Sequence, residues 1–204
     1  MSVPSSLPGV PAGERFDVVA IGTSAGGIRA LTRLLGEIPV DFPVPVLIVQ
    51  HLDPRHETLL AEVLARRTRL KVKLAEGEER VVPGVVYVAP PNRHLLVGEG
   101  GVLALTSTEL VHFVRPSADL LFESVAGAYG PAAIACVLTG TGFDGSTGVN
   151  AIKSRGGTVI VEDPESAEFS GMPRAAVHFA TPGFVLPLGE IATVLGQLVR
   201  AGRS

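Results

Sequence analysis

The sequence predicts an α/β protein with an open, doubly wound and mostly parallel sheet, helices on both faces and an antiparallel hairpin insertion. Three observations lead to this prediction. Short, continuous apolar runs alternate with segments of helical periodicity, and a middle stretch instead contains closely spaced strand-like runs. The chain has 204 residues, 46% of them hydrophobic, so one sizeable core can be buried. Strands that alternate with helices form parallel sheets through right-handed crossovers.

The chain opens with a segment that differs in composition from the rest. Residues 1–14 are rich in Pro, Gly and Ser, and we expect a flexible lead-in or the remnant of a linker there. Residues 15–204 are expected to form the folded domain. The runs FDVVAIG (16–22) and VPVLIVQ (44–50) are short and β-branched, as is typical of strands buried on both faces.

Apolar residues at helical spacing follow each of these two strands. The pair Asp53-Pro54 resembles a cap followed by a first helical position, so we expect the second helix to begin there. The apolar stripes of the two predicted helices consist of Ile28, Leu31, Leu34 and Leu35, and of Leu59, Leu60, Val63 and Leu64.

The stretch 71–106 has a different pattern. Short strand-like runs separated by Gly and Pro are expected to form antiparallel hairpins; they are KVKLAE, VVYVAP, HLLVG and VLALT. The alternation of helices and strands then returns. We expect a helix over 117–128, the strand AAIACVLTG, a helix opening near Asp144, the strand TVIVE, a short helix over 173–178, a short strand FVL and a closing helix. The apolar face of the closing helix contains Ile191, Val194, Leu195, Leu198 and Val199.

Composition argues against several classes of protein. Twenty acidic and seventeen basic residues give a net charge of −3, and Trp is absent, which is unlike a dedicated nucleic-acid-binding protein. The single cysteine, Cys136, excludes an internal disulfide framework, fits a reducing compartment and is expected to be inert inside an apolar strand. No apolar run reaches the roughly 18 residues of a membrane helix, and the first residues lack a signal peptide's apolar core. We therefore expect a cytoplasmic globular domain without direct membrane insertion.

Chemically competent side chains follow three of the predicted parallel strands. Ser24 lies in GTSAGG, His51 follows Gln50, and Asp144 lies in the loop TGTGFDG. Ligands of doubly wound sheets bind at the carboxyl ends of the strands, so these side chains are expected at one edge of the sheet. A hydroxyl, an imidazole and a carboxylate are the nucleophile, base and orienting acid of nucleophilic catalysis.

Each of the three residues also has a structural interpretation. Gly22-x-Ser24-x-Gly26 matches a nucleophile elbow, yet Ser24 could simply cap the following helix. His51 could be an edge histidine, and Asp144 could be an N-cap near a helix dipole. Unrelated caps need not converge on one edge, so the three together favour catalysis.

Two other kinds of site are less well supported. His51, Asp53 and His56 suggest a metal site, but the Asp-Pro helix start accounts for Asp53 and no CxxC or HExxH accompanies them, so no metal is expected. The glycine-rich first turn resembles a dinucleotide fingerprint. However, Ser24 replaces its second glycine, and the second strand ends in Gln50 and His51 instead of an acid. No cofactor is expected, and dinucleotide binding stays the minor alternative.

Six segments in order resemble the catalytic domain of the chemotaxis protein-glutamate methylesterases, the CheB family. They are VVAIGTSAGG, VLIVQHLDP, VYVAPPNRHL, FVRPSADLLFESVA, VLTGTGFDGSTG and EFSGMPRAA, and the similarity extends from about Asp17 to Val199. The resemblance implies a doubly wound sheet and a Ser-His-Asp triad. The family's nucleophile falls on Ser24, its histidine on His51 and its aspartate on Asp144.

The resemblance also implies an activity and partners. Family members hydrolyse glutamyl γ-methyl esters on the cytoplasmic helices of chemoreceptors, and some deamidate receptor glutamines. The stretch before Phe16 is too short for the receiver domain of full-length members, so the chain is either a stand-alone esterase domain or a fragment of a longer one. In the first case a separate receiver or regulatory protein is a further expected partner. The alternative is a non-catalytic receptor-binding module with a degenerate site, because Thr141 replaces the Met that is common in the family's T-G-M-G loop.

Other residues of these segments are expected to stabilise the oxyanion. The oxyanion of an acyl transfer needs preset N–H donors, and candidates lie around Thr23 and Ala25 and in the loop of Thr141 and Gly142.

Arg115 and Met172 are candidates for the substrate cleft. Arg115 could instead tie two loops together, and Met172 could only begin a helix. Arg93 and His94, in APPNRHL, are interpreted as structural support for the insertion.

Overall fold

The main sheet has seven strands, all of them parallel to their neighbours. The computed structural model describes residues 15–52 and 58–201. The strand order is β3-β4-β2-β1-β7-β8-β9, and a separate two-stranded sheet pairs β5 with β6 in antiparallel fashion. The bounds are β1 (Val18–Thr23), β2 (Val46–Gln50), β3 (Lys71–Leu74), β4 (Val85–Val88), β5 (His94–Val97), β6 (Leu103–Thr106), β7 (Ala133–Val137), β8 (Thr158–Glu162) and β9 (Phe184–Leu186).

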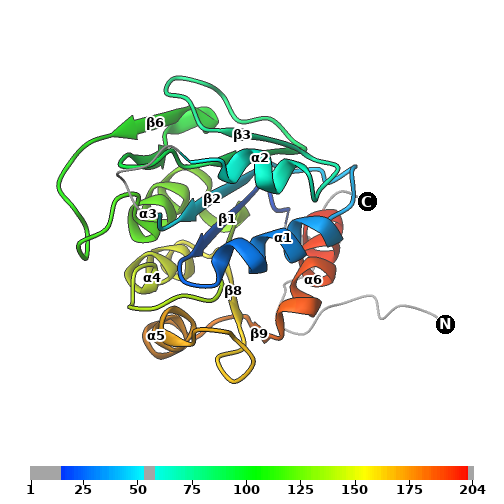
Figure 1. Cartoon of the computed structure of the whole chain (residues 1–204), viewed down its shortest axis with the longest axis vertical. Coiled ribbons are helices and arrows are strands. Elements are labelled where there is room, and N and C mark those ends of the chain that lie inside the picture. The colour runs from blue at the N-terminus through cyan, green and yellow to red at the C-terminus, as the bar shows by residue number, and fades with distance from the viewer. Residues whose placement is uncertain (1–14, 53–57, 202–204) are drawn as a thin grey trace.

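Helices cover both faces of this sheet (Figure 1). One buried cluster joins the sheet to α1 (Gly27–Glu37), α2 (Leu60–Ala65) and α6 (Leu188–Ala201). The other joins it to α3 (Ala118–Tyr129), α4 (Ser146–Ser154), α5 (Gly171–Phe179) and the β5–β6 hairpin. Successive residues of β1 alternate between the two clusters, as a strand buried on both faces requires. Two short 3-10 helices complete the chain, η1 (Glu99–Gly101) and η2 (Gly130–Ala132).

This architecture confirms the predicted fold class, and one part of the sequence interpretation was wrong. The stretch 71–106 was expected to form antiparallel hairpins, but only β5 and β6 do so. β3 and β4 are parallel strands of the main sheet, and β4 pairs with β2. The reason is visible in β4, where all four residues of VVYV are buried, as in a strand covered on both faces.

The apolar stripes of the first two helices are only partly buried. Leu31, Leu34 and Leu35 of α1 are buried as expected, but Ile28 is 44% exposed because it lies in the first turn, at the rim of a surface cleft. In α2, Leu60 and Leu64 are buried, whereas Leu59 and Val63 are exposed. The predicted start at Asp53-Pro54 lies outside the described residues.

The remaining predicted helices and strands agree with the structure. The predicted helices over 117–128 and 173–178 correspond to α3 and α5, and the helix expected near Asp144 corresponds to α4. The apolar face of α6 packs on the sheet as expected. Among the described helices, none combines the length and hydropathy needed to span a bilayer. The predicted lead-in, residues 1–14, lies outside the described residues.

Candidate active site

Ser24 lies on the tight turn between β1 and α1. Its N–H donates to the Thr139 carbonyl at 3.0 Å, and its own carbonyl accepts the N–H of Gly27 at 2.9 Å. The residue that caps α1 is Gly26, whose φ of +76° favours glycine, and no side chain caps this helix. The alternative in which Ser24 caps the helix is therefore wrong. The turn presents Ser24 at the carboxyl edge of the sheet.

His51 follows the neighbouring strand and lies beside this turn. Thr23 is in register with Gln50, and the N–H of His51 donates to the Thr23 carbonyl at 3.2 Å. The side-chain amide of the buried Gln50 donates to two carbonyls, that of Ser24 at 2.9 Å and that of His51 at 2.8 Å. Gln50 thus joins the two segments, a role that its place at a strand end did not reveal.

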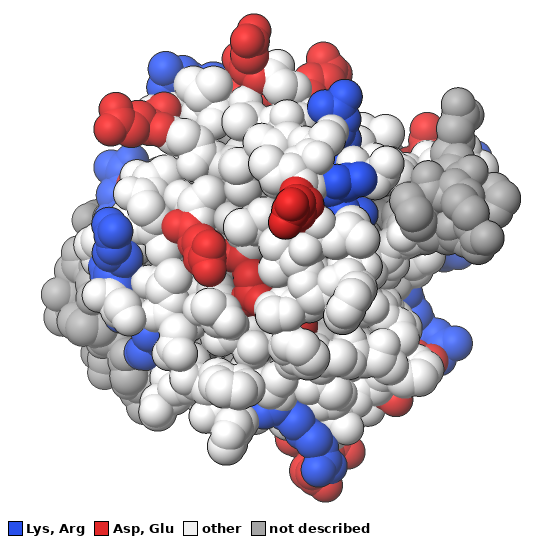
Figure 2. Space-filling view, turned by 90° about the vertical axis from the view of Figure 1, so that its left-hand side faces the viewer, with Lys and Arg blue, Asp and Glu red and all other residues white. Residues whose placement is uncertain are grey.

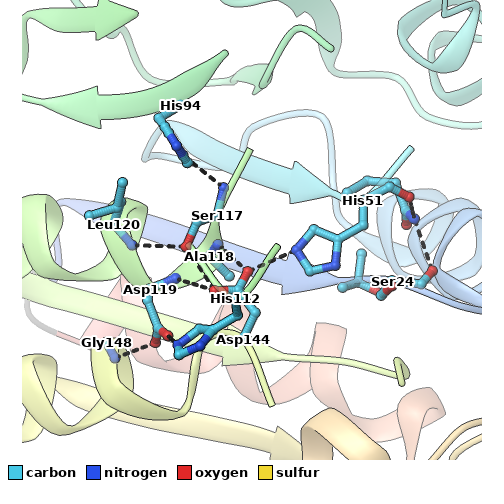
Figure 3. Close-up of polar contacts among 12 residues, drawn as sticks. Ser24, His51, His94, His112, Ser117, Ala118, Asp119, Leu120, Asp144 and Gly148 are labelled. Carbon is cyan, nitrogen blue, oxygen red and sulfur yellow. Dashed lines mark hydrogen bonds and ion pairs between the residues drawn. The ribbon is translucent and has the colours of Figure 1, made fainter. Parts of the chain in front are cut away.

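Asp144 reaches the imidazole from the loop that follows β7. Its Oδ2 lies 2.8 Å from His51 Nε2, although 93 residues separate the two in the chain (Figure 3). An ionised carboxylate only accepts hydrogen bonds, so Nε2 carries the proton of the neutral ring. Nδ1 then keeps its lone pair and is the nitrogen that can act as a base.

Several donors keep the Asp144 carboxylate ionised. Burial by itself would raise the pKa of Asp144, which is 4% exposed. Hydrogen bonds from His51, the Ala118 N–H and the Ser117 hydroxyl outweigh burial and hold this pKa below its usual value. The Ala118 N–H lies 2.6 Å from Oδ2 and the Ser117 hydroxyl 2.7 Å from Oδ1. The alternative in which Asp144 only caps the helix that follows it is wrong, because Gly145 caps α4 and no side chain does so. The carboxylate instead accepts N–H groups at the start of α3.

Ser24 and His51 line the same surface cleft of about 320 Å³. Figure 3 shows the His51 ring between the Asp144 carboxylate and Ser24. The strands β1 and β2, whose carboxyl ends lead to Ser24 and His51, point toward the face seen in Figure 2. Its lining also includes Ile28, Arg29, Gln50, Leu52 and Glu168. A hydroxyl, an imidazole and an ionised carboxylate therefore lie along one edge of the sheet.

The backbone near Ser24 offers hydrogen-bond donors. The N–H groups of Ala25 and Gly142 have no acceptor among the described residues. A Cβ added to Gly140 would lie 3.0 Å from Ser24 Cβ, so the 140–142 loop passes directly beside the serine. Thr23 supports this turn through its side chain, which is buried and donates to the Thr139 carbonyl at 2.7 Å.

Thr141 lies in the same loop and its side chain is exposed, so the position that distinguishes this chain from the common family pattern does not pack against the core. Gly142, which follows it, has a φ of +82°.

Arg115 and Met172 do not line the cleft described above. The Arg115 guanidinium donates to the Asn92 side chain and to the carbonyls of Ser107 and Thr108, so it ties two loops together. Met172 is 1% exposed, and its N–H donates to the Gly140 carbonyl at 2.9 Å. Its burial makes it a packing residue beneath the loop rather than a substrate contact.

His94 is fully buried and has a structural role, as expected. Its Nδ1 accepts the N–H of Ser117 at 3.2 Å, and its Nε2 lies 3.0 Å from the Glu109 carbonyl. It therefore supports the residue that in turn donates to Asp144.

A second histidine–aspartate pair lies beside the first, and sequence reasoning missed it. His112 Nε2 lies 3.1 Å from Asp119 Oδ2, and Asp119 Oδ1 accepts the N–H of Gly148 at 2.6 Å. Burial raises the pKa of Asp119, the Gly148 N–H lowers it, and the charge of Asp144 raises it further. An acidic residue in the first turn after Ser117 signals the start of α3, but no local pattern indicates its contacts with His112 and α4.

The structure also bears on the suggested metal site and on Cys136. Among the described residues, no group of three His, Cys, Asp or Glu side chains could hold a metal ion, and Asp53 and His56 lie outside them. Cys136 is buried, which raises the pKa of its thiol and leaves it unreactive.

Comparison with known proteins gives consistent similarities. A family model described as CheB methylesterase matches residues 19–195. A putative protein-glutamate methylesterase/protein-glutamine glutaminase of Leptospira interrogans is 39% identical over 183 residues, which cover 90% of this chain and 95% of the relative. The protein-glutamate methylesterase FrzG of Myxococcus xanthus is 40% identical over 184 residues, which cover 90% of this chain and 55% of the relative. The crystal structure of the Thermotoga maritima CheB methylesterase catalytic domain matches with a TM-score of 0.87 and 38% identity, over 91% of this chain and 100% of that chain.

Proposed function

Because the chain belongs to the CheB methylesterase family, as its six ordered segments indicated, we propose that it hydrolyses methyl esters of glutamate side chains in a protein substrate. The names of its relatives combine methylesterase with glutaminase. Both activities hydrolyse a neutral derivative of the same side-chain carboxyl group, an ester in one case and an amide in the other. One nucleophile therefore serves both.

The catalytic residues in this proposal are Ser24, His51 and Asp144. Nδ1 of His51 removes the proton of the Ser24 hydroxyl as the oxygen attacks the ester carbonyl, and Asp144 stabilises the imidazolium that forms. The imidazolium returns the proton to the leaving methoxide, which departs as methanol and leaves an acyl-enzyme. His51 then activates a water molecule that releases the glutamate. The observation that supports this assignment is the 2.8 Å contact between His51 and Asp144, together with the cleft that His51 and Ser24 both line.

The oxyanion of the tetrahedral intermediate needs donors that are already in place. The N–H groups of Ala25 and Gly142 are our candidates, because neither has an acceptor among the described residues and both segments adjoin Ser24. Since these donors belong to the backbone, the presence of Thr141 in place of Met is compatible with catalysis. This favours the enzyme over the non-catalytic binding module.

The proposed substrate is a glutamyl ester on the cytoplasmic helices of a chemoreceptor, with residues 15–204 as the catalytic domain. Such a substrate would place the enzyme in the cytoplasm.

Two measurements on the Ser24→Ala variant test the function. A serine-reactive fluorophosphonate should label the unchanged protein at Ser24, and the variant should not be labelled. Methanol release from a methyl-esterified receptor fragment should fall by about 10³-fold or more in the variant, with unchanged circular dichroism. Methanol release at the original rate by the folded variant would exclude Ser24 as the nucleophile.

A further inference from the structure

We propose that Glu168 makes the cleft select the neutral glutamyl ester or amide over the glutamate carboxylate that the reaction produces. This inference rests on the proposed function, because it concerns the charge difference between its substrate and its product. The ester and the amide are uncharged, whereas the product carries a full negative charge in the same place.

The Glu168 carboxylate lies in the cleft that contains Ser24 and His51. It lies against Gly26, since a Cβ added to that glycine would be 3.1 Å from Glu168 Oε2. Gly26 is only two residues beyond Ser24 and caps α1. The negative charge is therefore located beside the turn that bears the nucleophile, in a cleft that Ser24 also lines.

Hydrogen bonds to Thr139 hold the segment of Glu168 in this place. The Thr139 hydroxyl accepts the N–H of Phe169 at 2.8 Å and donates to the Ala25 carbonyl at 3.0 Å. The Phe169 carbonyl in turn accepts the N–H of Gly140 at 2.9 Å. The residue that follows Glu168 is thus joined both to the nucleophile turn and to the 140–142 loop, so the backbone that bears Glu168 has a fixed place beside the site.

The guanidinium of Arg29, which pairs with Glu168, is mostly exposed to solvent. Arg29 Nη1 is 3.3 Å from Glu168 Oε2, but the Arg29 side chain is 83% exposed and that of Glu168 40% exposed. Water screens an exposed guanidinium strongly, so this pair neutralises the charge in the cleft only in part. Figure 2 shows acidic side chains near the middle of this face, with basic side chains also present on it.

A carboxylate in this position acts differently on substrate and product. It does not repel a neutral ester or amide, but it repels the glutamate that forms from either. If the product carboxylate binds about 6 Å from Glu168, repulsion at a partly screened protein surface changes binding by about three- to tenfold. Glu168 therefore weakens product binding by this factor, which favours product release and limits inhibition by the demethylated receptor.

The test compares the affinity of substrate and product in variants of the whole chain. The substrate is a synthetic receptor-helix peptide with one glutamyl γ-methyl ester, and the inhibitor is the same peptide with glutamate at that position. The measured quantity is the ratio of the product Ki to the ester KM at low ionic strength. We expect a ratio of about three to ten for the unchanged enzyme and about one for Glu168→Gln. Arg29→Gln removes the partial countercharge and should widen the ratio.

Glu165→Gln is the matched control. Glu165 lies on the same segment and pairs with Arg174, but its side chain is 80% exposed and it does not line the cleft. This variant should keep the original ratio, and roughly 1 M salt should reduce the ratio of the unchanged enzyme because the Debye length falls to about 3 Å. A ratio near one in the unchanged enzyme, an unchanged ratio in Glu168→Gln, or an equal loss in Glu165→Gln would overturn the proposal.

A failure of the proposed function gives a different result. If the unchanged enzyme does not release methanol from the peptide, inhibition of p-nitrophenyl acetate hydrolysis by glutamate and glutamine forms of the peptide supplies the ratio instead. Equal inhibition by both forms, including no inhibition by either, would then reject the role of Glu168.

Discussion

Asp144 and Asp119 connect two helices, because each carboxylate accepts main-chain N–H groups from the helix that contains or follows the other residue. Asp144 accepts those of Ala118 and Asp119 at the start of α3, while Asp119 accepts that of Gly148 in the first turn of α4. α4 follows Asp144 in the chain, so the two carboxylates fasten α3 and α4 to each other. Asp144 therefore has two separable roles, one toward His51 and one toward the fold.

Two substitutions of Asp144 should separate these roles. Asp144→Asn keeps an oxygen at the Oδ1 position for the Ser117 hydroxyl and the Asp119 N–H. At the Oδ2 position it places an amide donor, which faces the Ala118 N–H and also favours the wrong tautomer of His51. We expect kcat to fall by about 10³- to 10⁴-fold, with a smaller loss of stability than in Asp144→Ala because only part of the hydrogen bonding to α3 is lost. Asp144→Ala should lose as much activity and also about 1–3 kcal/mol of unfolding free energy, because buried donors lose their acceptor.

Ester hydrolysis assays and urea unfolding measure the two effects. Equal destabilisation by Asn and Ala would show that the charge of Asp144, and not its acceptor geometry, supports α3.

Acid should remove the stabilisation that Asp144 provides. Its pKa in the folded protein lies below the value of about 4 in the unfolded chain, so near that pH the unfolded state binds more protons. Its contribution to stability is present above about pH 4 and is lost as the pH falls through the folded pKa. The stability difference between the unchanged protein and Asp144→Asn, measured by urea unfolding between pH 3 and 7, should shrink on acidification.

Asp119 supplies the control with the opposite sign. Its folded pKa is raised, so its contribution is present at low pH and is lost as the pH rises from about 4 through the folded pKa. Parallel pH profiles for Asp144→Asn and Asp119→Asn would contradict both assignments.

Gln50 should affect the rate of the chemical step more than substrate binding. Gln50→Leu removes both hydrogen bonds that join the Ser24 and His51 segments, so the nucleophile and its base lose their relative position. Small displacements of reacting groups cost up to about 100-fold in rate, and we expect kcat to fall by about 10- to 100-fold with a nearly constant KM.

Steady-state kinetics with the methyl-ester peptide measure this split. Gln197→Leu, at an exposed position on α6, is the control and should behave as the unchanged enzyme. A rise in KM at constant kcat would indicate that Gln50 contacts substrate instead.

The loop of Thr141 and Gly142 should tolerate one substitution and not the other. The Thr141 side chain is exposed, so Thr141→Met should change kcat/KM by less than about threefold, because its backbone N–H and conformation stay the same. Gly142 has a φ of +82° and nothing within 4 Å of an added Cβ, so Gly142→Ala introduces backbone strain without a clash. That variant should lose about 1 kcal/mol of stability and part of its activity.

Activity and thermal unfolding of both variants provide the measurement. A large loss of activity in Thr141→Met would mean that the side chain at this position shapes the loop.

Local patterns explain how much could be predicted from the sequence. Continuous apolar runs such as FDVVAIG identify buried parallel strands because both faces of such a strand need apolar residues. The carboxyl ends of these strands then indicate one edge of the sheet, where Ser24, His51 and Asp144 were expected. The same logic applied to VVYV would have placed β4 in the main sheet, but its position between Gly- and Pro-rich turns favoured a hairpin.

The sequence alone therefore determined the fold class, the order of the helices and strands and the edge where the chemistry lies, because these depend on side-chain periodicity along a local stretch. The tertiary structure alone decided which partners the polar side chains have. His51 and Asp144 are 93 residues apart, and Arg115 reaches Asn92 and not the cleft. Hydrogen bonds depend on distances and angles in space, and only the packing of helices on the sheet brings residues so far apart in the chain within bonding distance.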